Sequence, residues 1–377
     1  MSAPVEDALI VAGGAGTRLW PLTAATPKPL LPFCGAPFLT GVLRRLADVG
    51  VRRVWLVVGA DPSPFEVLRP RAVQLGIDLV AVPEPTPLDT AGGVREAIEH
   101  IEATCLVLNG DILTDVDLAA AVATHRDAGA AATLVLTRVA DTSSYGVCVR
   151  EGTRIVGFVE KPAPGELPDQ DAVNAGTYVL EPAAMRRFPR GRLSFERTVF
   201  PELVAAGAHV EGVASTAVWA DLGTRTRYLD GHRLALDGEL DWPTLAEVPV
   251  WPAPGHGARV ASHGVRAADD VEVADDAEVV GPALLGPGVR IGSGARIGPH
   301  AVLGAGTRVA AGAQVTDSVL DVATQVGPRS RLAGVATGSA ATLGADVQAT
   351  GGALVGAREQ VPDGAELEPD ATVPAWS

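Results

Sequence analysis

Lysine and asparagine are scarce in this chain, and the few that occur stand in segments that could do chemistry. Of the 30 lysine and arginine residues, only Lys28 and Lys161 are lysines, and Asn109 and Asn174 are the only asparagines. Lysine is a compact point charge on a flexible stem, whereas arginine is a planar fork. In a chain that uses arginine almost everywhere else, Lys28 and Lys161 are candidates for work that needs a point charge; the alternative is that they are chance survivors of a composition bias.

A glycine-rich turn precedes Lys28. The predicted strand Ala8–Val11 runs into Ala12-Gly13-Gly14-Ala15-Gly16-Thr17-Arg18-Leu19, and such a turn lets backbone N–H groups approach phosphate oxygens. It is not a dinucleotide fingerprint, whose third glycine would fall on Leu19, and no Gly-Lys-Ser/Thr of a Walker loop follows. Three prolines between residues 21 and 29 stiffen the next segment and are expected to aim Arg18 and Lys28 at one place. Two cations over a glycine loop suit a triphosphate.

Two further candidates follow predicted strands. Asp111 comes after Cys105–Leu108, where a carboxylate is well placed for Mg²⁺, a cation that takes one or two carboxylates plus phosphate oxygens. Glu160 and Lys161 end the strand Ile155–Val159. Without further information, an ordinary turn or helix cap at Asp111 and a solvated turn at Glu160 would be the simpler interpretations.

Strand–helix alternation positions these residues. Strands are also predicted at 54–58, 77–82, 133–139, 147–149 and 173–180, and helices at 37–49, 64–75, 91–101, 116–128 and 195–206. This alternation predicts an α/β, Rossmann-like domain with a mostly parallel sheet, in which ligands bind beyond the carboxyl ends of the strands. The segment 237–257 is rich in Pro, Trp and Gly without a period, and we expect it to be a linker.

The last third of the chain has a six-residue period. Apolar residues recur at this spacing without a break at Val273, Val279, Leu285, Ile291, Ile297, Leu303, Val309 and Val315. The period returns in a shifted phase at Leu320, Val326 and Leu332, and resumes at Leu343, Val355, Val361 and Leu367. It predicts a hexapeptide-repeat parallel β-helix, with loops or a turn near 316–320 and 333–342. A Gly/Ala-rich linker would have no fixed period.

Composition narrows the class of protein. The formal net charge of −15 argues against nucleic acid as a partner. No apolar run reaches the roughly 18 residues of a membrane helix, and the acidic N-terminus does not resemble a signal peptide. Three widely spaced cysteines, Cys34, Cys105 and Cys148, suit a reducing compartment and form no zinc spacing. We therefore expect a cytoplasmic protein without a membrane partner, in which a few local cations and Mg²⁺ offset the unfavourable overall charge.

The motifs together resemble the NDP-sugar pyrophosphorylases, especially the mannose-1-phosphate guanylyltransferases. Their opening signature, Gly-Gly-x-Gly-Thr-Arg-Leu followed by Pro-Leu-Thr and Pro-Lys-Pro-Leu, stands here from Gly13 to Leu30. The resemblance implies an enzyme that transfers a nucleotidyl group from a nucleoside triphosphate to a sugar 1-phosphate and releases pyrophosphate. It also implies catalytic roles for Arg18, Lys28, Asp111 and Lys161.

The same resemblance assigns the binding residues. It implies Mg²⁺ ligands at Asp111 and at Asp221, in Trp219-Ala220-Asp221-Leu222-Gly223-Thr224. The implied nucleotide-binding residues are Ala12, Gly13, Gly14, Gly16, Thr17, Arg18, Thr90, Gly92 and Gly110. The implied sugar-phosphate contacts are Glu160, Lys161, Asn174, Gly176 and Glu196, although the stretch Ser194–Pro201 could also be an ordinary capped helix start.

One further motif bears on which nucleotide base and which sugar the protein uses. The segment Leu88-Asp89-Thr90-Ala91-Gly92 matches the loop that meets the base, except that Asp89 replaces the usual glycine. The thymidylyl- and uridylyltransferases of this family typically carry Gln or His nearby. This chain has neither there, and the resemblance therefore favours a purine base. GTP and mannose 1-phosphate are the expected substrates, and another sugar or cyclitol 1-phosphate, or glucose 1-phosphate with ATP or dTTP, is the alternative.

The resemblance covers residues 8–235. The expected domains are a nucleotidyltransferase domain at 1–236, a linker at 237–262 and a left-handed β-helix at 263–377 that holds a homo-oligomer. The expected reaction is in-line attack of the sugar-phosphate oxygen on the α-phosphorus. Two rivals are a non-catalytic regulatory subunit and an acyltransferase that uses His300 between the coils, although a solvent-facing turn is the simpler interpretation of His300.

Overall fold

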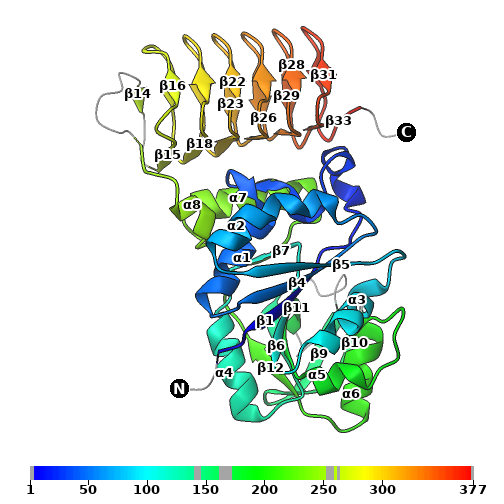
Figure 1. The fold of residues 1–377 in the computed structure, drawn as a ribbon. Helices are drawn as coiled ribbons and strands as arrows, with labels where there is room; N and C mark the ends of the chain where they lie inside the picture. The colour runs from blue at the N-terminus through cyan, green and yellow to red at the C-terminus, as the bar shows by residue number, and fades with distance from the viewer. Residues whose placement is uncertain (1–3, 140–145, 161–171, 252–258, 261–263, 375–377) are drawn as a thin grey trace. The chain divides into compact units, whose positions relative to one another are not determined.

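The computed structural model describes residues 4–139, 146–160, 172–251, 259–260 and 264–374. By internal contacts the chain divides into two compact units (Figure 1). Residues 1–14 and 42–219 form the first, called the sheet unit here, and residues 15–41 and 220–377 form the second, called the β-helix unit. The domain boundaries predicted at 236 and 262 stay a prediction. The segment 15–41, which carries Arg18 and Lys28, therefore belongs with the β-helix.

A mixed sheet forms the centre of the sheet unit. In the described part of the chain it has nine strands in the order β5-β4-β1-β6-β11-β8-β12-β10-β9. The strands span Asp7–Val11 (β1), Arg53–Val58 (β4), Asp78–Pro83 (β5), Cys105–Asn109 (β6), Ala132–Arg138 (β8), Gly146–Glu151 (β9), Arg154–Glu160 (β10), Ala172–Leu180 (β11) and Val210–Ala214 (β12). Strands β5, β4, β1 and β6 are parallel, whereas β11 is antiparallel to β6. The parallel part brings the carboxyl ends of β1, β4 and β6 to one edge, as the alternation predicted.

Helices cover this sheet, and prolines break two of the predicted ones. The α-helices span Phe38–Asp48 (α1), Arg69–Gln74 (α2), Asp89–Ala97 (α3), Leu118–Ala128 (α4), Pro182–Arg186 (α5) and Phe200–Ala205 (α6). The predicted helix 64–75 begins as a 3₁₀ segment, Ser63–Leu68, before α2. The predicted helix 195–206 begins as a π-helical turn, Phe195–Val199. Pro70 and Pro201 stand near the starts of α2 and α6, because proline has no N–H to donate to the preceding turn.

The structure confirms the β-helix that the six-residue period predicted. Three parallel sheets run along it: one from β14 (Arg259–Val260) to β32 (Glu366–Leu367), one from β15 (Val265–Ala267) to β33 (Thr372–Val373), and one from β16 (Glu272–Val273) to β31 (Gln360–Val361). The apolar residues of the repeat, such as Ile297 and Leu303, point inward and are buried. The chain thus has the predicted α/β domain followed by a left-handed parallel β-helix.

The phase shifts are deletions rather than inserted loops. Most pairings join residues 18 apart, as in Ala283↔Ala301, whereas Val302 pairs with Val319 and Val319 with Ala336, 17 residues apart. Each shift near 316–320 and 333–336 therefore removes one residue from a coil. The prediction of loops or a turn at these positions was wrong. The stack tolerates the deletion because the inward apolar positions stay aligned from coil to coil.

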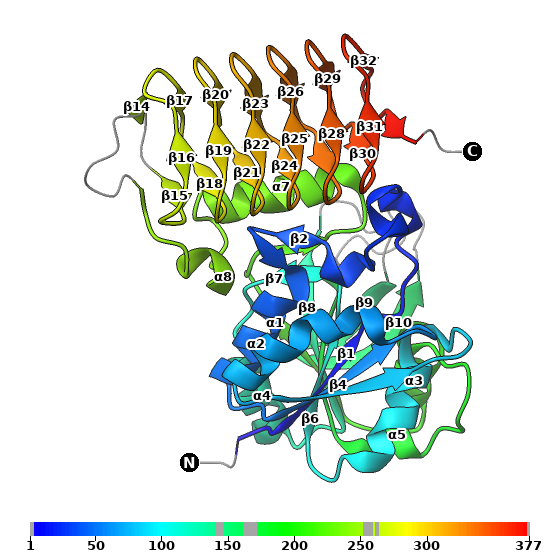
Figure 2. The same ribbon diagram turned by 45° about the horizontal axis from the view of Figure 1, so that its top comes forward.

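One sheet of the β-helix is apolar on its outer side as well. Its strands between β15 and β33 are β18 (Ala283–Leu285), β21 (Ala301–Leu303), β24 (Val319–Leu320), β27 (Ala336–Thr337) and β30 (Leu354–Val355). Outward positions such as Leu284, Val302, Val319 and Leu354 are buried there. Other parts of the β-helix unit cover them. A Cβ on Gly35, in the hairpin β2–β3 (Pro32–Phe33 and Ala36–Pro37), would lie 3.3 Å from Leu284. Helix α7 (Arg225–Leu236) extends along the row of coils (Figure 2).

Polar contacts fasten α7 to the coils. Arg233 Nε donates to Asp317 Oδ1 at 3.0 Å, and Arg225 Nη1 donates to the carbonyl oxygens of Gly352 and Asp370 at 3.2 and 2.5 Å. The described part of the predicted linker is also structured, since it holds a short helix, Pro243–Ala246 (α8), and the buried Trp242 and Trp251. The apolar sheet face is thus an internal interface, at which each buried leucine contributes roughly 1.5–3 kcal/mol. No helix among the described residues is long and apolar enough to cross a membrane.

A buried histidine in α7 predicts a pH dependence of stability. His232 is 1% exposed and packs against Phe33 with ring centres 4.5 Å apart. Burial lowers the pKa of His232 to about 4, against about 6.5 in an unfolded chain. Between these values the unfolded state binds one proton more than the folded state, so stability falls as the pH falls. From pH 7 to pH 5 we expect His232 to remove about 2 kcal/mol of unfolding free energy.

Urea unfolding at pH 7 and pH 5 checks this. His232→Gln should be less stable than wild type at pH 7 but should lose about 2 kcal/mol less on acidification. His209→Gln is the control, because His209 is 35% exposed and pairs with Glu211. Equal pH slopes for wild type and His232→Gln would contradict the prediction.

Candidate active site

In the sheet unit, the glycine turn after β1 and the loop that carries Asp111 after β6 lie side by side, because β1 and β6 are neighbours and Val11 pairs with Asn109. The Gly110 N–H donates to the carbonyl oxygen of Val11 at 2.8 Å, and a Cβ on Gly110 would lie 2.9 Å from that oxygen. This close approach requires glycine. The predicted nucleotide residues Ala12, Gly13 and Gly14 thus begin beside Gly110.

The predicted sugar strand lies on the other side of β6. Gly176 has a φ of 71°, and a Cβ there would lie 2.6 Å from Asn109 Nδ2, so only glycine lets β11 approach this closely. Asn174 Oδ1 accepts the Gly176 N–H at 3.0 Å, and Asn174 Nδ2 donates to the Tyr178 hydroxyl at 2.8 Å. Both asparagines of the chain therefore lie at one place on the sheet, with Gly176 between them.

Hydrogen bonds join the base loop, residues 88–92, to the segment that carries Glu196. Thr90 Oγ1 donates to Glu196 Oε2 at 2.9 Å and accepts the Phe195 N–H at 3.0 Å. The backbone adds Ala91 N to Leu193 O at 2.9 Å. Glu196 lies on the π-helical turn, a feature that is frequent at functional sites. The structure thus brings together a predicted nucleotide residue and a predicted sugar residue.

The backbone conformation at Asp89 shows why relatives have a glycine at this position. Its φ is 67°, in the left-handed region where glycine is favoured and aspartate is tolerated. The carboxylate compensates locally, because Oδ1 accepts the Thr90 N–H at 3.0 Å. Its other oxygen pairs with Arg197 at 2.6 Å and with Arg192 at 3.5 Å. Asp89 therefore ties the base loop to the segment that carries Glu196.

A buried carboxylate that was not predicted supports the same loop. Glu84 is 8% exposed, and burial raises the pKa of its carboxyl group, although N–H groups of Leu88 and Gly93 act in the opposite direction. A Cβ on Gly93 would lie 2.4 Å from Glu84 Oε1, and one on Gly13 would lie 3.2 Å from Oε2. The carboxylate therefore lies between the base loop and the glycine turn. A lone glutamate in Pro-Glu-Pro carries no sequence signal for this position.

In the β-helix unit, three cations surround Asp221. Lys28 Nζ lies 3.2 Å from Asp221 Oδ1, whereas Arg227 Nη1 and Arg18 Nη2 lie 3.3 and 3.7 Å from Oδ2. The Lys28 side chain is 9% exposed and that of Asp221 20%, but Arg18 is 64% exposed. Three positively charged side chains thus approach one carboxylate in this unit.

Glycines shape this cluster. A Cβ on Gly223 would lie 2.6 Å from Arg18 Nη2 and 2.7 Å from Asp221 Oδ1. Gly16 has a φ of 61°, and a Cβ on it would lie 3.0 Å from the Lys28 Cβ. Thr23 Oγ1 donates to the Gly16 carbonyl at 3.1 Å and holds the turn closed. Arg18 and Lys28 thus reach one place, the carboxylate of Asp221, as predicted from the prolines between them.

The side chains of two predicted residues lie outside the described part of the chain. Lys161 lies outside the described residues, and of Glu160 only the backbone is described, paired with Gly146 at the end of β10. Their roles stay predictions. Arg227 and Arg197 are functional candidates that sequence reasoning missed. Arginine is common in this chain, Arg227 lies outside the motifs, and in the stretch 194–201 only Glu196 was assigned a role.

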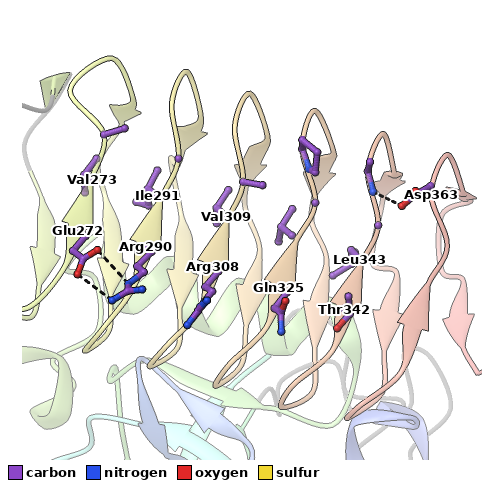
Figure 3. Close-up of a pocket in the computed structure, with 18 residues that line it drawn as sticks. Glu272, Val273, Arg290, Ile291, Arg308, Val309, Gln325, Thr342, Leu343 and Asp363 are labelled. Carbon is purple, nitrogen blue, oxygen red and sulfur yellow. Dashed lines mark hydrogen bonds and ion pairs between the residues drawn. The ribbon is translucent and has the colours of Figure 1, made fainter.

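A groove on the β-helix contains none of the predicted site residues. It has a volume of about 770 Å³ and lies along β16, β19 (Arg290–Ile291), β22 (Arg308–Val309), β25 (Gln325–Val326) and β28 (Thr342–Leu343). Figure 3 shows its outer row of Glu272, Arg290, Arg308, Gln325 and Thr342 across successive coils. Glu272 and Arg290 pair with each other at 3.2 Å, which is typical of a solvated polar face.

His300 is not part of this groove either. Its Nε2 lies 2.8 Å from Asp237 Oδ1, and its Nδ1 lies 3.4 Å from Asp317 Oδ1. Both ring nitrogens thus face carboxylates of this chain, and the side chain is 21% exposed rather than on an open turn. The contacts favour a structural role that joins the end of α7 to the coils over the acyltransferase alternative.

Comparison with known proteins finds a matching family model, related sequences and related structures. The family model described as nucleotidyl transferase matches residues 7–238. A mannose-1-phosphate guanylyltransferase of Mycobacterium tuberculosis is 39% identical over 249 residues, which cover 65% of this chain and 68% of that protein. The catalytic subunit beta of the Danio rerio mannose-1-phosphate guanylyltransferase is 36% identical over 230 residues, 59% of this chain and 63% of that one. Among solved structures, HddC from Yersinia pseudotuberculosis complexed with GMP-PN is similar at 27% identity and a TM-score of 0.51, over 60% of this chain and 98% of HddC.

Proposed function

The chain belongs to the nucleotidyl transferase family, and we propose that it joins GTP to mannose 1-phosphate, giving GDP-mannose and pyrophosphate. The observation that carries this proposal is the 39% identity to a mannose-1-phosphate guanylyltransferase over 249 residues. The link between Thr90 and Glu196 supports it, since one residue is proposed to contact the nucleotide and the other the sugar. The departure at Asp89 does not oppose GTP, because its carboxylate is engaged by Thr90, Arg197 and Arg192.

The proposed mechanism needs no protein nucleophile. An oxygen of the sugar phosphate is already an anion and attacks the α-phosphorus in line, forming one P–O bond while the bond to the leaving pyrophosphate breaks. The protein contributes positioning and charge stabilisation. Arg18 and Lys28 stabilise the charge that moves onto the pyrophosphate, and Lys161 holds the sugar phosphate against its repulsion from the triphosphate. The turn residues Ala12, Gly13, Gly14, Gly16 and Thr17 offer backbone N–H groups to the nucleotide phosphates.

The remaining binding residues are proposed to contact the nucleoside of the nucleotide and the sugar of the sugar phosphate. Thr90, Gly92 and Gly110 border the nucleoside, and Glu160, Asn174, Gly176 and Glu196 border the sugar. A Cβ on Gly92 would lie 2.5 Å from the Gly191 carbonyl oxygen, so this position cannot carry a side chain without moving the loop. Binding both substrates through one hydrogen-bonded pair, Thr90 and Glu196, aligns the attacking oxygen with the α-phosphorus.

Mg²⁺ is the proposed cofactor. No group of three or more His, Cys, Asp and Glu side chains that could hold a metal is present in the described ranges, but Mg²⁺ requires only one or two carboxylates plus phosphate oxygens. Asp221 fits this donor set, because its carboxylate is 20% exposed and lies beside Arg18 and Lys28, the cations proposed to bind the phosphates. Asp111 and Asp221, each on its own motif, are the proposed ligands. Bound Mg²⁺ would neutralise phosphate charge.

Assembly, location and domain boundaries are also proposals. We propose a cytoplasmic homo-oligomer joined through the β-helix, with a catalytic domain at 1–236, a linker at 237–262 and the β-helix at 263–377. One sheet of the β-helix already packs inside its own unit, so the two polar sheets are the faces available to a second copy. Light scattering on the purified chain would measure the oligomer size.

The test is pyrophosphate release from GTP, ATP, dTTP and UTP, each combined with mannose, glucose and other sugar or cyclitol 1-phosphates and Mg²⁺. We expect the highest kcat/KM with GTP and mannose 1-phosphate. A different best pair would correct the specificity and keep the reaction. No release with any pair from folded protein would favour the regulatory-subunit alternative.

The ion pair at Asp89 gives a further prediction. In Asp89→Gly the left-handed backbone is relieved while the contacts to Arg197 and Arg192 are lost. Both arginines are well exposed, so the loss should be about 1 kcal/mol. We expect unchanged thermal stability and a roughly fivefold higher KM for the sugar phosphate, with the KM for GTP nearly unchanged, because the segment carrying Glu196 loses its tie.

Steady-state kinetics with each substrate varied in turn measure this. Asp89→Asn should behave alike, because asparagine also tolerates this backbone but carries no charge. Glu66→Gln is the control, since it breaks an exposed pair with Arg69. A sugar-phosphate KM that stays at the wild-type value in both Asp89 variants would refute the positioning role.

A further inference from the structure

We propose that Arg225 is a positioning residue, through which two coils of the β-helix hold Asp221 and the cations beside it in place. Arg18, Lys28 and Asp221 are called the phosphate cluster here. The proposal rests on the proposed function and gives the β-helix a part in the reaction itself, besides assembly. Arg225 is the first residue of α7, and the whole phosphate cluster belongs to the same β-helix unit.

The bonds of Arg225 to the coils are the first argument. Its Nη1 atom donates to the carbonyl oxygens of Gly352 and Asp370 at 3.2 and 2.5 Å. Gly352 follows β29 (Gln348–Thr350), and Asp370 follows β32 at the corresponding place one coil later. A Cβ on Gly352 would lie 3.2 Å from Arg225 Cδ, so a side chain there would crowd the arginine. One guanidinium thus joins two successive coils, and only 21% of its side chain is exposed.

The helix itself does not explain a cation at position 225. Thr224 caps α7 by accepting the Arg227 N–H at 3.3 Å, so Arg225 lies in the first helical turn. A cation in this turn is unfavourable, because it opposes the helix dipole. Hydrogen bonds from a charged donor are strong, and those to the two coil carbonyls offset this cost. The arginine is therefore better explained by its bonds to the coils than by helix stability.

A short segment connects Arg225 to the phosphate cluster. Asp221 ends β13 (Trp219–Asp221), and Gly223 lies between it and α7. A Cβ on Gly223 would lie 2.6 Å from Arg18 Nη2 and 2.7 Å from Asp221 Oδ1, so the segment lies directly against both side chains. A shift of the start of α7 would therefore move Asp221 relative to its cations.

The same end of the β-helix also contacts the segment that carries Arg18 and Lys28. A Cβ on Gly356, which follows β30, would lie 3.2 Å from the Cβ of Pro21. Pro21 stands between Arg18 and Lys28, and Lys28 is 193 positions from Asp221. Two segments far apart in the sequence thus contact neighbouring coils, and a rigid support of this kind holds binding groups in position before the ligand arrives.

Loss of Arg225 should weaken binding of GTP and pyrophosphate more than binding of the sugar phosphate. Arg18 and Lys28 are the groups proposed to stabilise charge on the leaving pyrophosphate, and both contact Asp221. The proposed sugar residues Asn174 and Glu196 belong to the sheet unit instead. A residue that only stabilises the fold would not separate the two substrates in this way.

The experiment compares Arg225→Gln with Arg233→Gln in the full-length protein with Mg²⁺. Arg233 is the matched control, because it fastens the same helix to Asp317 at 3.0 Å but stands roughly two turns further from the phosphate cluster. In Arg225→Gln we expect the KM for pyrophosphate in the reverse reaction to rise about fivefold or more, because small misplacements of binding groups are costly. The KM for mannose 1-phosphate should stay within about twofold.

In Arg233→Gln both KM values should stay within about twofold of the wild-type values. Thermal unfolding should be affected similarly in the two variants, since each loses a contact between α7 and the coils. Arg225→Lys should recover part of the loss, because an ammonium group also donates to carbonyl oxygens.

An unchanged pyrophosphate KM in Arg225→Gln would overturn the proposal. Equal increases in Arg225→Gln and Arg233→Gln would also overturn it, because they would indicate that α7 needs only general support, and so would equal increases for pyrophosphate and mannose 1-phosphate. If the wild-type protein released no pyrophosphate from any substrate pair, the proposed function would fail. Calorimetric binding of pyrophosphate would then still test Arg225, and equal affinity or no binding in wild type and both variants would overturn its role.

Discussion

Lys28→Gln is expected to lower kcat/KM for GTP by about two to three orders of magnitude, as the loss of one preorganised group that stabilises transition-state charge does in other enzymes. Lys28 is 9% exposed and lies 3.2 Å from Asp221. Charge in such a shielded position interacts more strongly with a phosphate than the exposed Arg18 can. Glutamine keeps most of the length and polarity of lysine but removes the charge.

Two further variants make the Lys28 prediction specific. Lys28→Arg keeps the charge but places a larger planar group where Gly16 and Thr23 lie close, and we expect it to recover less than a tenth of the lost activity. Arg308→Gln is the control, because the same position in a neighbouring coil already holds Gln325. Steady-state pyrophosphate release measures all three, and near-wild-type kcat/KM in Lys28→Gln would exclude Lys28 from the phosphate site.

Asp111→Asn is expected to reduce kcat at saturating Mg²⁺ by about two orders of magnitude or more, because the variant loses a charged ligand of the proposed metal. Asp111 directly follows Gly110, whose N–H is bound by Val11 at 2.8 Å, so its backbone is held beside the glycine turn. Asparagine has nearly the same shape, so the fold should be unaffected. The concentration of Mg²⁺ needed for half-maximal activity should rise as well.

A titration of activity against Mg²⁺ concentration checks this, with Asp117→Asn as the control. Asp117 caps α4 by accepting the Ala120 N–H at 2.9 Å, and asparagine caps a helix as well as aspartate does. Asp221→Asn should show the same increase in Mg²⁺ demand. An Asp111→Asn variant with full activity and an unchanged Mg²⁺ titration would sink the metal assignment.

Much of the fold was predictable because it depends on local periodicity. The strands β1, β4 and β6 and the six-residue repeat follow from apolar residues at regular spacing, which report burial directly. Helix α7 was not predicted, because its exposed arginines hide the period and its buried face, including Tyr228 and His232, packs on the hairpin and the coils. The one-residue deletions at 316–320 and 333–336 could not be told from loops, since spacing alone does not show which strands pair.

The site was predictable where a motif carries it. Gly16, Arg18, Lys28, Asp111 and Asp221 stand in such motifs. The clamp between Asp89 and Arg197 joins residues 108 positions apart, and Arg227 gains its meaning only from its distance to Asp221. Such contacts arise from tertiary packing, and no pattern along the chain records them.

The transfer of the nucleotidyl group itself can be tested with mannose 1-phosphate labelled with ¹⁸O in its non-bridging phosphate oxygens, incubated with GTP and Mg²⁺. Mass spectrometry of both products reports which phosphorus the sugar phosphate attacks. We predict that GDP-mannose carries all of the label and that pyrophosphate carries none, because the attacking oxygen becomes the bridge to the α-phosphorus. Label in the pyrophosphate, or release of pyrophosphate without a labelled GDP-mannose, would contradict it.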